Sequence, residues 1–229
     1  MKRYLSAALA LLVVAGATAT FADTPRERLQ NTTTVLQEIM TAPDRSIPRD
    51  LLDKAHCVVV IPAAKTGAFI VGGKYGRGYA VCRSPRGIGW GPPAGVRMEG
   101  GSFGFQIGGS ETDVVLLVMN RRGMDKLLES KFTLGGEAEV AAGPVGRSST
   151  AQTDAKMTAK ILSYSRSRGV FAGISLQGAT LRADLNENER LYGHRYSNKR
   201  ILQGQVPAPG AAANLLSLLN RYSRTESGA

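Results

Sequence analysis

The sequence predicts an α+β fold, in which N-terminal helices precede a Gly-rich, mainly antiparallel β-sheet or barrel-like core. Apolar residues recur at helical spacing between residues 25 and 55, and the pattern then changes to short β-branched runs. Between residues 95 and 119, glycines alternate with larger residues, which is typical of strands that bend or pack closely. With 229 residues, 43% of them hydrophobic, the chain can bury one sizeable core.

Two helices are expected before the first strand. Thr24 is a good N-cap, Pro25 suits the first turn, and Glu27 completes a capping box. This helix should run to about Thr41 with one apolar stripe, and core packing is the favoured role of that stripe. A second short helix is expected at about residues 48–55.

The strands follow from residue 57. The run 57–61 should end at Pro62, and runs 67–72 and 78–83 should form a hairpin with a basic tip at 73–77. Residues 113–119 read as a strand buried on both faces. Further strands are expected within 132–146, 160–164 and 169–178, and short helices at 121–130 and 186–192. After a linker at 207–210, residues 211–222 predict an amphipathic helix carrying Leu215, Leu216, Leu218 and Leu219.

The first 22 residues have the features of a secretory signal peptide. Lys2 and Arg3 precede an apolar run of 11 residues, and small residues follow, with cleavage expected after Ala19 or Ala22. The run is short for a bilayer-spanning helix, which needs ~20 residues. We therefore expect an exported protein, periplasmic or secreted, and three segments: 1–22, the domain 23–205, and the linker, helix and tail 206–229. Cleavage would lower the formal net charge from +11 to +9, since the leader carries two basic residues and no acidic one.

The two cysteines, Cys57 and Cys82, could pair in an oxidising compartment. Unpaired cysteines are also common as small buried strand residues. We expect the second arrangement, because a domain of this size does not need a covalent link.

No catalytic, metal or cofactor site is predicted. His56 and His194 are the only histidines, and neither lies in a zinc-binding spacing. Ser175 lacks the second glycine of a nucleophile elbow. In residues 67–74, Gly73 stands where a phosphate-binding loop requires lysine, and Tyr75 follows Lys74 in place of Ser or Thr. The sequence therefore favours a protein that is not an enzyme and binds no cofactor.

The basic residues suggest contact with an anionic surface. Candidate positions for lipid binding are Arg26, Arg28, Lys65, Lys74, Arg77, Arg121, Arg122 and Lys126, and a further basic cluster contains Arg195, Lys199 and Arg200. A solvated face is the ordinary alternative for such charges. Three or four cations near an anionic membrane supply ~3–4 kcal/mol, only millimolar affinity, so stable attachment needs an apolar contact as well. Aromatic residues do not interleave with the cations, which argues against nucleic acid as the partner.

Several motifs resemble the SYLF domain family. They are residues 61–78, the run GGSFGFQIG at 100–108, TLGG at 133–136, AGPVGR at 142–147 and SRGVFAGISL at 167–176. The resemblance covers about residues 29–202. It implies a lipid-binding module, since eukaryotic members bind phosphoinositide membranes, largely through a basic N-terminal amphipathic helix, and some fungal members bind actin. Here the corresponding helix carries Arg26 and Arg28 early, then the uncharged residues 31–34, then Gln37 and Glu38, so it is less basic than a phosphoinositide-binding helix.

The sequence thus predicts a non-enzymatic protein of the cell envelope that associates with anionic phospholipid through a basic surface. The alternative is an envelope scaffold that docks a protein partner through the Leu215–Leu219 helix. An enzyme with a site that the motifs do not show is a third possibility.

Overall fold

A computed structural model describes residues 23–43, 46–69, 71–85, 87–103, 108–137, 139–145, 161–167, 170–173, 176 and 178–223. The expected signal peptide, the strand residues around Ser175 and the last residues of the tail lie outside these ranges. The helices are α1 (Pro25–Thr41), α2 (Arg49–Lys54), α3 (Arg121–Leu128), α5 (Leu185–Tyr192), α6 (Asn198–Leu202) and α7 (Ala213–Tyr222). The strands are β1 (Cys57–Phe69), β2 (Val71–Cys82), β3 (Ala94–Phe103), β4 (Gly108–Val118), β5 (Lys131–Thr133), β6 (Val140–Ala142), β7 (Ile161–Ser167), β8 (Val170–Gly173) and β9 (Thr180–Ala183).

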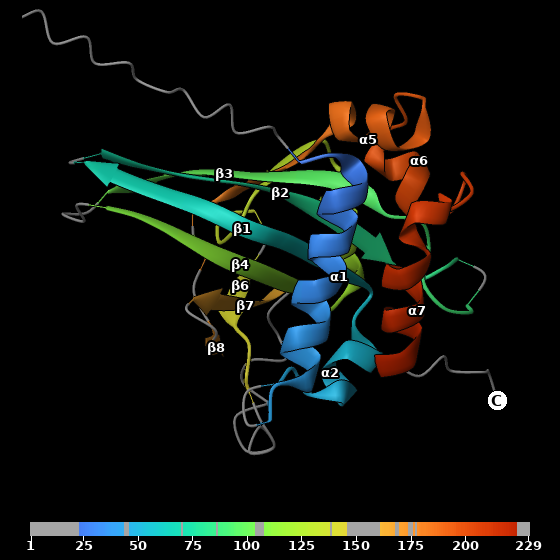
Figure 1. The fold of residues 1–229 in the computed structure, drawn as a ribbon, viewed down its shortest axis with the longest axis horizontal. Coiled ribbons are helices and arrows are strands. Elements are labelled where there is room, and N and C mark those ends of the chain that lie inside the picture. Colours follow the sequence, from blue (N-terminus) through green and yellow to red (C-terminus); the bar gives the residue numbers. More distant parts are fainter. Residues whose placement is uncertain are drawn as a thin grey trace, which may run out of the picture.

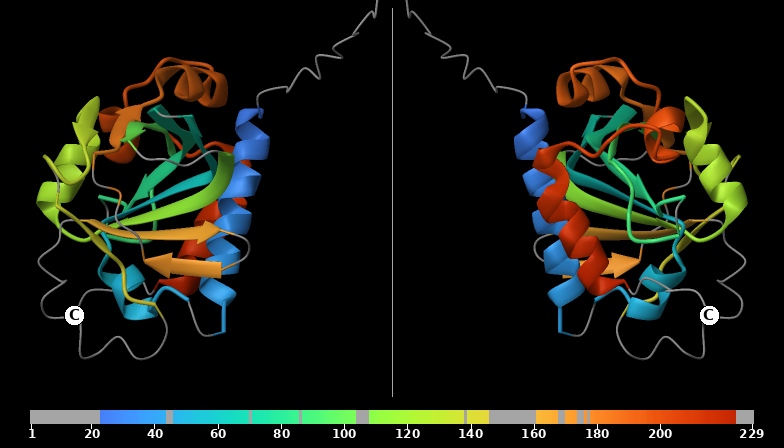
Figure 2. Two further views of the ribbon diagram at one scale, coloured as in Figure 1. Left: turned by 90° about the vertical axis from the view of Figure 1, so that its left-hand side faces the viewer. Right: turned by 90° about the vertical axis from the view of Figure 1, so that its right-hand side faces the viewer.

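In the described part of the chain, one sheet runs in the order β5-β9-β3-β2-β1-β4-β7-β6, with β8 also paired to β7. All pairs are antiparallel except β6–β7. Helices α1, α2 and α7 cover one face and α3 lies on the opposite side (Figures 1 and 2). The expected α+β class with a mainly antiparallel sheet is confirmed.

Two core clusters fill the two sides of the sheet. The first combines the apolar stripes of α1, α2 and α7 with strand residues such as Val58, Val60 and Val115. The second combines the alternate strand residues, including Val59 and Leu116, with residues of α3, α6, β5 and β9. Successive strand side chains point to opposite faces, so the continuous apolar runs in β1 and β4 supply both cores. Of the predicted run 113–119, residues 114–118 are buried, whereas Asp113 and Met119 at its ends are half-buried.

Helix α1 begins where the capping box predicts. The Thr24 side chain accepts a hydrogen bond from the Glu27 backbone N–H, and the Glu27 carboxylate accepts one from the Thr24 backbone. The stripe of α1 is buried in the first core, as favoured above. Helix α7 lies beside α1 and joins the same core, so the C-terminal helix is an integral part of the domain fold (Figure 1).

The first hairpin differs from the expectation. Strand β1 does not end at Pro62, because a bulge between Ile61 and Ala64 lets it continue to Phe69. Ala63, at the bulge, has φ of 46°, and its N–H donates to Asp113. Phe69 of β1 pairs with Val71 of β2, so residues 73–77 lie within β2 and the expected basic tip at 73–77 is wrong.

The predicted strand pair within 132–146 is also wrong. Strand β5 pairs with β9, which the sequence did not predict, and β6 pairs with β7. Short strands have weak local patterns, and their partners are chosen by tertiary packing.

Cys57 and Cys82 form a disulfide, so the expectation of unpaired cysteines is wrong. The two residues lie directly opposite each other in the β1–β2 register, with Cα atoms 3.9 Å apart. A separation of 25 residues hides this proximity in the sequence, because only the hairpin register creates it.

Candidate functional site

The eight predicted lipid-binding residues lie in three separate places. Arg26 and Arg28 are on α1, Lys65, Lys74 and Arg77 are on the β1–β2 hairpin, and Arg121, Arg122 and Lys126 are on α3. Helices α1 and α3 lie on opposite sides of the sheet (Figure 2). The structure therefore does not gather the eight residues into a single face.

Arg28 is buried. Its residue is only 5% exposed, and its guanidinium lies 2.5 Å from Oε1 of Glu187, which is fully buried on α5. The same carboxylate oxygen accepts a hydrogen bond from the Tyr79 hydroxyl at 2.6 Å. Burial and the neighbouring Glu187 both raise the pKa of Tyr79. Arg28 thus joins α1 to α5 and β2, and its charge is compensated inside the protein.

Arg77 belongs to the same network. Its Nε donates to Asp184 at 2.6 Å, and one terminal nitrogen donates to Glu187 at 3.2 Å. Burial alone would lower the pKa of Arg77, but the hydrogen bond and charge of Asp184 outweigh it, and the net pKa is raised. The Asp184 side chain also caps α5 by accepting from the Glu187 N–H, which fixes the position of both carboxylates.

A neutral part of the network continues toward α6. Asn188 accepts from the backbone N–H of Gly95 and donates to Asn198, which in turn donates to the Gly95 carbonyl. A Cβ atom on Gly95 would lie 2.8 Å from Cβ of Glu187, so this close approach requires glycine. The buried polar network therefore holds the segment after β9 against β3.

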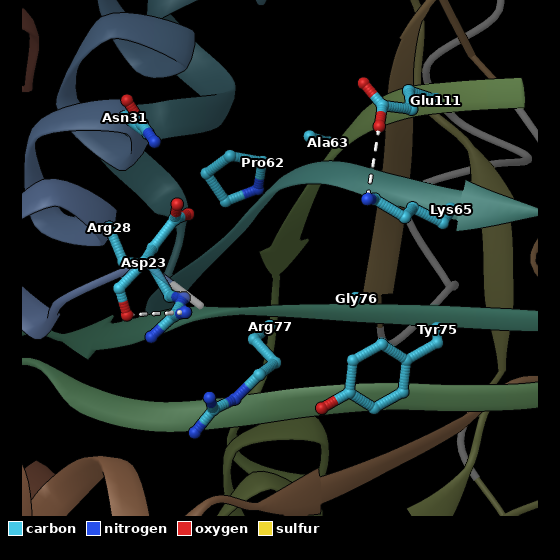
Figure 3. Close-up of a pocket in the computed structure, with 10 residues that line it drawn as sticks. All are labelled: Asp23, Arg28, Asn31, Pro62, Ala63, Lys65, Tyr75, Gly76, Arg77 and Glu111. Atoms are coloured by element: carbon cyan, nitrogen blue, oxygen red, sulfur yellow. Dashed lines mark hydrogen bonds and ion pairs between the residues drawn. The ribbon is translucent and has the colours of Figure 1, made fainter. Parts of the chain in front are cut away.

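A pocket of about 520 Å³ opens above the two arginines, between α1 and the β1–β2 hairpin. Its lining residues are Asp23, Arg28, Asn31, Pro62, Ala63, Lys65, Tyr75, Gly76, Arg77 and Glu111 (Figure 3). Lys65 lies 3.5 Å from Glu111 in an exposed ion pair. The lining has three cations and two carboxylates, and Asp184 and Glu187 beneath it bring the carboxylates to four, so the pocket has no excess of positive charge. Among these lining residues none is His, Cys, Ser or Thr, so the pocket offers hydrogen bonds without a nucleophile of those types.

The exposed cations of α3 have a different setting. Arg121 and Arg122 are exposed, while Lys126 is partly engaged by Glu129 at 2.9 Å. Helix α3 contacts α6, which carries exposed Lys199 and Arg200. Within the described ranges, no carboxylate forms an ion pair with Arg121, Arg122, Lys199 or Arg200. We call these four residues the α3–α6 basic surface.

On the hairpin, Lys74 also has no carboxylate partner among the described residues, and it is partly exposed. Arg26 is exposed on α1 and borders a small polar pocket with Gln30 and Asn214. The predicted positions that remain open to solvent are thus Arg26, Lys65, Arg121 and Arg122, with Lys74 and Lys126 partly so.

Neither leucine-bearing helix offers its apolar stripe to a partner. On α1, Leu29, Leu36 and Ile39 are at most 2% exposed. On α7, Leu215, Leu218 and Leu219 are at most 7% exposed. Docking a partner through the Leu215–Leu219 stripe would require α7 to leave the core.

The described ranges contain neither a cluster of metal ligands nor a helix suited to crossing a bilayer. There, no group of three or more His, Cys, Asp or Glu side chains is placed to hold a metal ion. Nor does any described helix have the length and hydropathy needed to cross a bilayer.

A single curved sheet with helices on both sides, a buried ion-pair network and a polar pocket between α1 and the β1–β2 hairpin characterise this domain. Residues 99–222 match the model of the family Ysc84, described as Las17-binding protein actin regulator. The chain belongs to this family, whose domain is the SYLF domain, and the resemblance drawn from the motifs is confirmed.

Relatives in three organisms show the same relationship. The chain is 34% identical over 182 residues to the SH3 domain-containing YSC84-like protein 1 of Rattus norvegicus, covering 79% of this chain and 53% of that protein. It is 34% identical over 179 residues to Protein YSC84 of Saccharomyces cerevisiae, covering 77% and 38%. It is 36% identical over 177 residues to the SH3 domain-containing protein PJ696.02 of Schizosaccharomyces pombe, covering 76% and 41%. The chain thus spans about half or less of the length of these relatives.

Proposed function

We propose that the protein is a non-enzymatic lipid-binding protein of the cell envelope, which associates with anionic phospholipid through a basic surface. The observation that carries the proposal is the α3–α6 basic surface. Its four exposed cations lack carboxylate partners among the described residues, so their charge is available to an anionic headgroup. Lys74 adds a further cation on the hairpin.

The envelope location has two supports. The first 22 residues have the charge and hydropathy pattern of a signal peptide. The Cys57–Cys82 disulfide suits an oxidising compartment, since intracellular thiols are normally kept reduced. Cell fractionation with signal-peptide mapping tests this part directly, and a full-length chain in the cytoplasm would contradict it.

Lipid binding is tested by co-sedimentation of the chain from Asp23 onward with vesicles of phosphatidylcholine, with or without phosphatidylglycerol, across a salt series. We expect binding only to the anionic vesicles and weaker binding as salt rises. Replacing Arg121 and Arg122 with glutamine should weaken binding about 30-fold, since each cation near the membrane contributes ~1 kcal/mol.

The matched control is K54Q/R221Q, which removes the same charge from two exposed residues on α2 and α7. If the control loses as much affinity as R121Q/R122Q, binding follows net charge and not the α3–α6 basic surface. Equal binding to neutral and anionic vesicles would contradict the proposal.

A protein partner is the second candidate function, and the family description favours it, since it names a Las17-binding actin regulator. The buried leucines of α7 make that stripe a poor docking site, so a partner would use exposed surface. Cross-linking in envelope extracts, followed by comparison of the wild type with N214D/S217D at two exposed positions of α7, tests the C-terminal route. Unchanged cross-links in the folded variant would exclude it.

A further inference from the structure

We propose that the pocket between α1 and the β1–β2 hairpin binds a neutral sugar through one pyranose ring. We call this site the α1–hairpin pocket. The inference goes beyond the proposed lipid binding and does not depend on it. The pocket is lined by α1, whereas α3 of the α3–α6 basic surface lies on the opposite side of the sheet (Figure 2).

The α1–hairpin pocket has the size of a small-molecule site. Its volume of about 520 Å³ falls within the ~300–1,000 Å³ that is typical of ligand pockets. Arg28 and Asn31 line it from α1, while Lys65, Tyr75 and Glu111 line it from the strands (Figure 3). Side chains from both sides can therefore contact one bound ring.

The backbone at the pocket is unusual in a way that favours a binding site. Strand β1 bulges between Ile61 and Ala64, and both residues of the bulge, Pro62 and Ala63, line the pocket. Ala63 has a φ of 46°, and among the described residues it is the only one other than glycine with a positive φ. Bulges and strained backbone are concentrated at functional sites. This observation supports a ligand site independently of the pocket volume.

The charges of the pocket favour a ligand that has no net charge. The three cations of its lining all form ion pairs, two of them with the buried carboxylates of the network described above. An anionic ligand would meet no uncompensated cation, and the exposed carboxylates of Asp23 and Glu111 would repel it. A neutral ligand can bind while every ion pair stays formed.

The paired groups keep hydrogen-bonding capacity for hydroxyl groups. Arg28 and Arg77 each donate two hydrogen bonds to described residues, and a guanidinium has further N–H groups to offer. The carboxylates of Asp23 and Glu111 accept hydrogen bonds in several directions. Sugar hydroxyls both donate and accept, so they match such a mixture of donors and acceptors.

Tyr75 supplies the apolar part of the site. It is one of two large hydrophobic residues that are exposed in the described part of the chain, with 49% of its surface open to solvent. It pairs with Lys65 in the β1–β2 register, which places it at the strand side of the pocket (Figure 3). One face of a pyranose ring consists of C–H groups that can stack on an aromatic ring, and an aromatic side chain gives a large apolar contact. An exposed ring beside paired polar groups is the combination that a sugar requires.

A glycan array tests the class of ligand. The chain from Asp23 onward, detected through a C-terminal tag, is applied to an array of neutral sugars, anionic sugars and protonated amino sugars. We expect binding to neutral pyranosides. Absence of binding to every neutral glycan would overturn the inference, and so would a preference for anionic or amino sugars.

Calorimetric titration with the best-bound neutral glycan tests the location. Y75A should weaken binding about tenfold, because the stacking contact is lost. E111A should also weaken it about tenfold, because a charged acceptor is lost. The matched controls are I88A and E139A, which remove an exposed apolar and an exposed acidic side chain outside the pocket and should bind like the wild type.

Circular dichroism and urea unfolding establish that each variant is folded. Unchanged affinity in folded Y75A and E111A would overturn the assignment to this pocket and leave the proposed lipid binding intact. A trisaccharide of the same sugar distinguishes two sources of the ligand, and both results support the inference. Tighter binding of the trisaccharide would identify a glycan chain, whereas equal affinity would identify a free sugar.

Discussion

Replacing Glu187 with glutamine tests the buried ion-pair network most directly. The substitution keeps the shape of the side chain and removes its charge. Glu187 is fully buried and accepts from Arg28, Arg77 and Tyr79. After the change, Arg28 remains a buried cation that faces an amide, part of which is itself a donor.

We expect E187Q to lower the free energy of unfolding by ~3–5 kcal/mol, the usual cost of removing one partner from a buried ion pair. Urea unfolding, followed by circular dichroism, measures it. The matched control is E189Q on the same helix, where Glu189 and Arg195 form an ion pair with both side chains 53% exposed. Exposed pairs contribute ~0–1 kcal/mol, so the control should unfold close to the wild type.

A double variant separates the pair from the packing. R28M/E187M removes both charges and should recover part of the loss, because no uncompensated Arg28 cation remains. Loss of less than about 1 kcal/mol in E187Q would refute the reasoning, since it would mean that the network is hydrated or loosely formed.

Three further predictions concern the strands and the first helix. G78A should lower the free energy of unfolding by ~3 kcal/mol or more in urea, because the added Cβ would lie 1.9 Å from a β1 carbonyl oxygen, whereas G73A, which meets nothing within 4 Å, should cost little. Reducing the Cys57–Cys82 disulfide should lower the free energy of unfolding by about 3.5 kcal/mol for a separation of 25 residues, and a smaller change on adding dithiothreitol would contradict this. The hydrogen bonds from Thr24 lower the pKa of Glu27, so its contribution to stability is present above about pH 4.5 and is lost as the pH falls through the folded pKa. E27Q should therefore flatten this part of the pH–stability curve, and an unchanged slope would contradict the assignment.

Local signals predicted the helices well. The capping box fixed the start of α1, and the apolar stripe gave its buried face, because both depend on residues within a few positions of each other. The uninterrupted apolar run 114–118 identified a strand buried on both faces for the same reason.

Contacts between residues far apart in the sequence could not be predicted from local patterns. Arg28 and Glu187 are 159 residues apart, and only the folded arrangement of α1 and α5 makes them partners. The composition of α1 therefore predicted a surface cation at Arg28, whereas its guanidinium is buried and forms an ion pair with Glu187. Pro62 read as a strand end, because the pattern gave no sign of the bulge that carries β1 past it.

The structure separates the predicted cations into different settings, since Arg28 and Arg77 face carboxylates and the others lie in separate places. Exposed cations do occur, yet a net charge of +11 says nothing about which of them face carboxylates.

The disulfide has a mechanical consequence for the longest strands. It closes residues 57–82 into a covalent ring at the end opposite Phe69 and Val71. Because the disulfide joins β1 and β2 at Cys57 and Cys82, a pulling force can neither separate the two strands at that end nor slide β1 along β2 there. The ring also prevents two molecules from exchanging only one of these strands, so β1 and β2 of the oxidised protein stay paired within the same molecule.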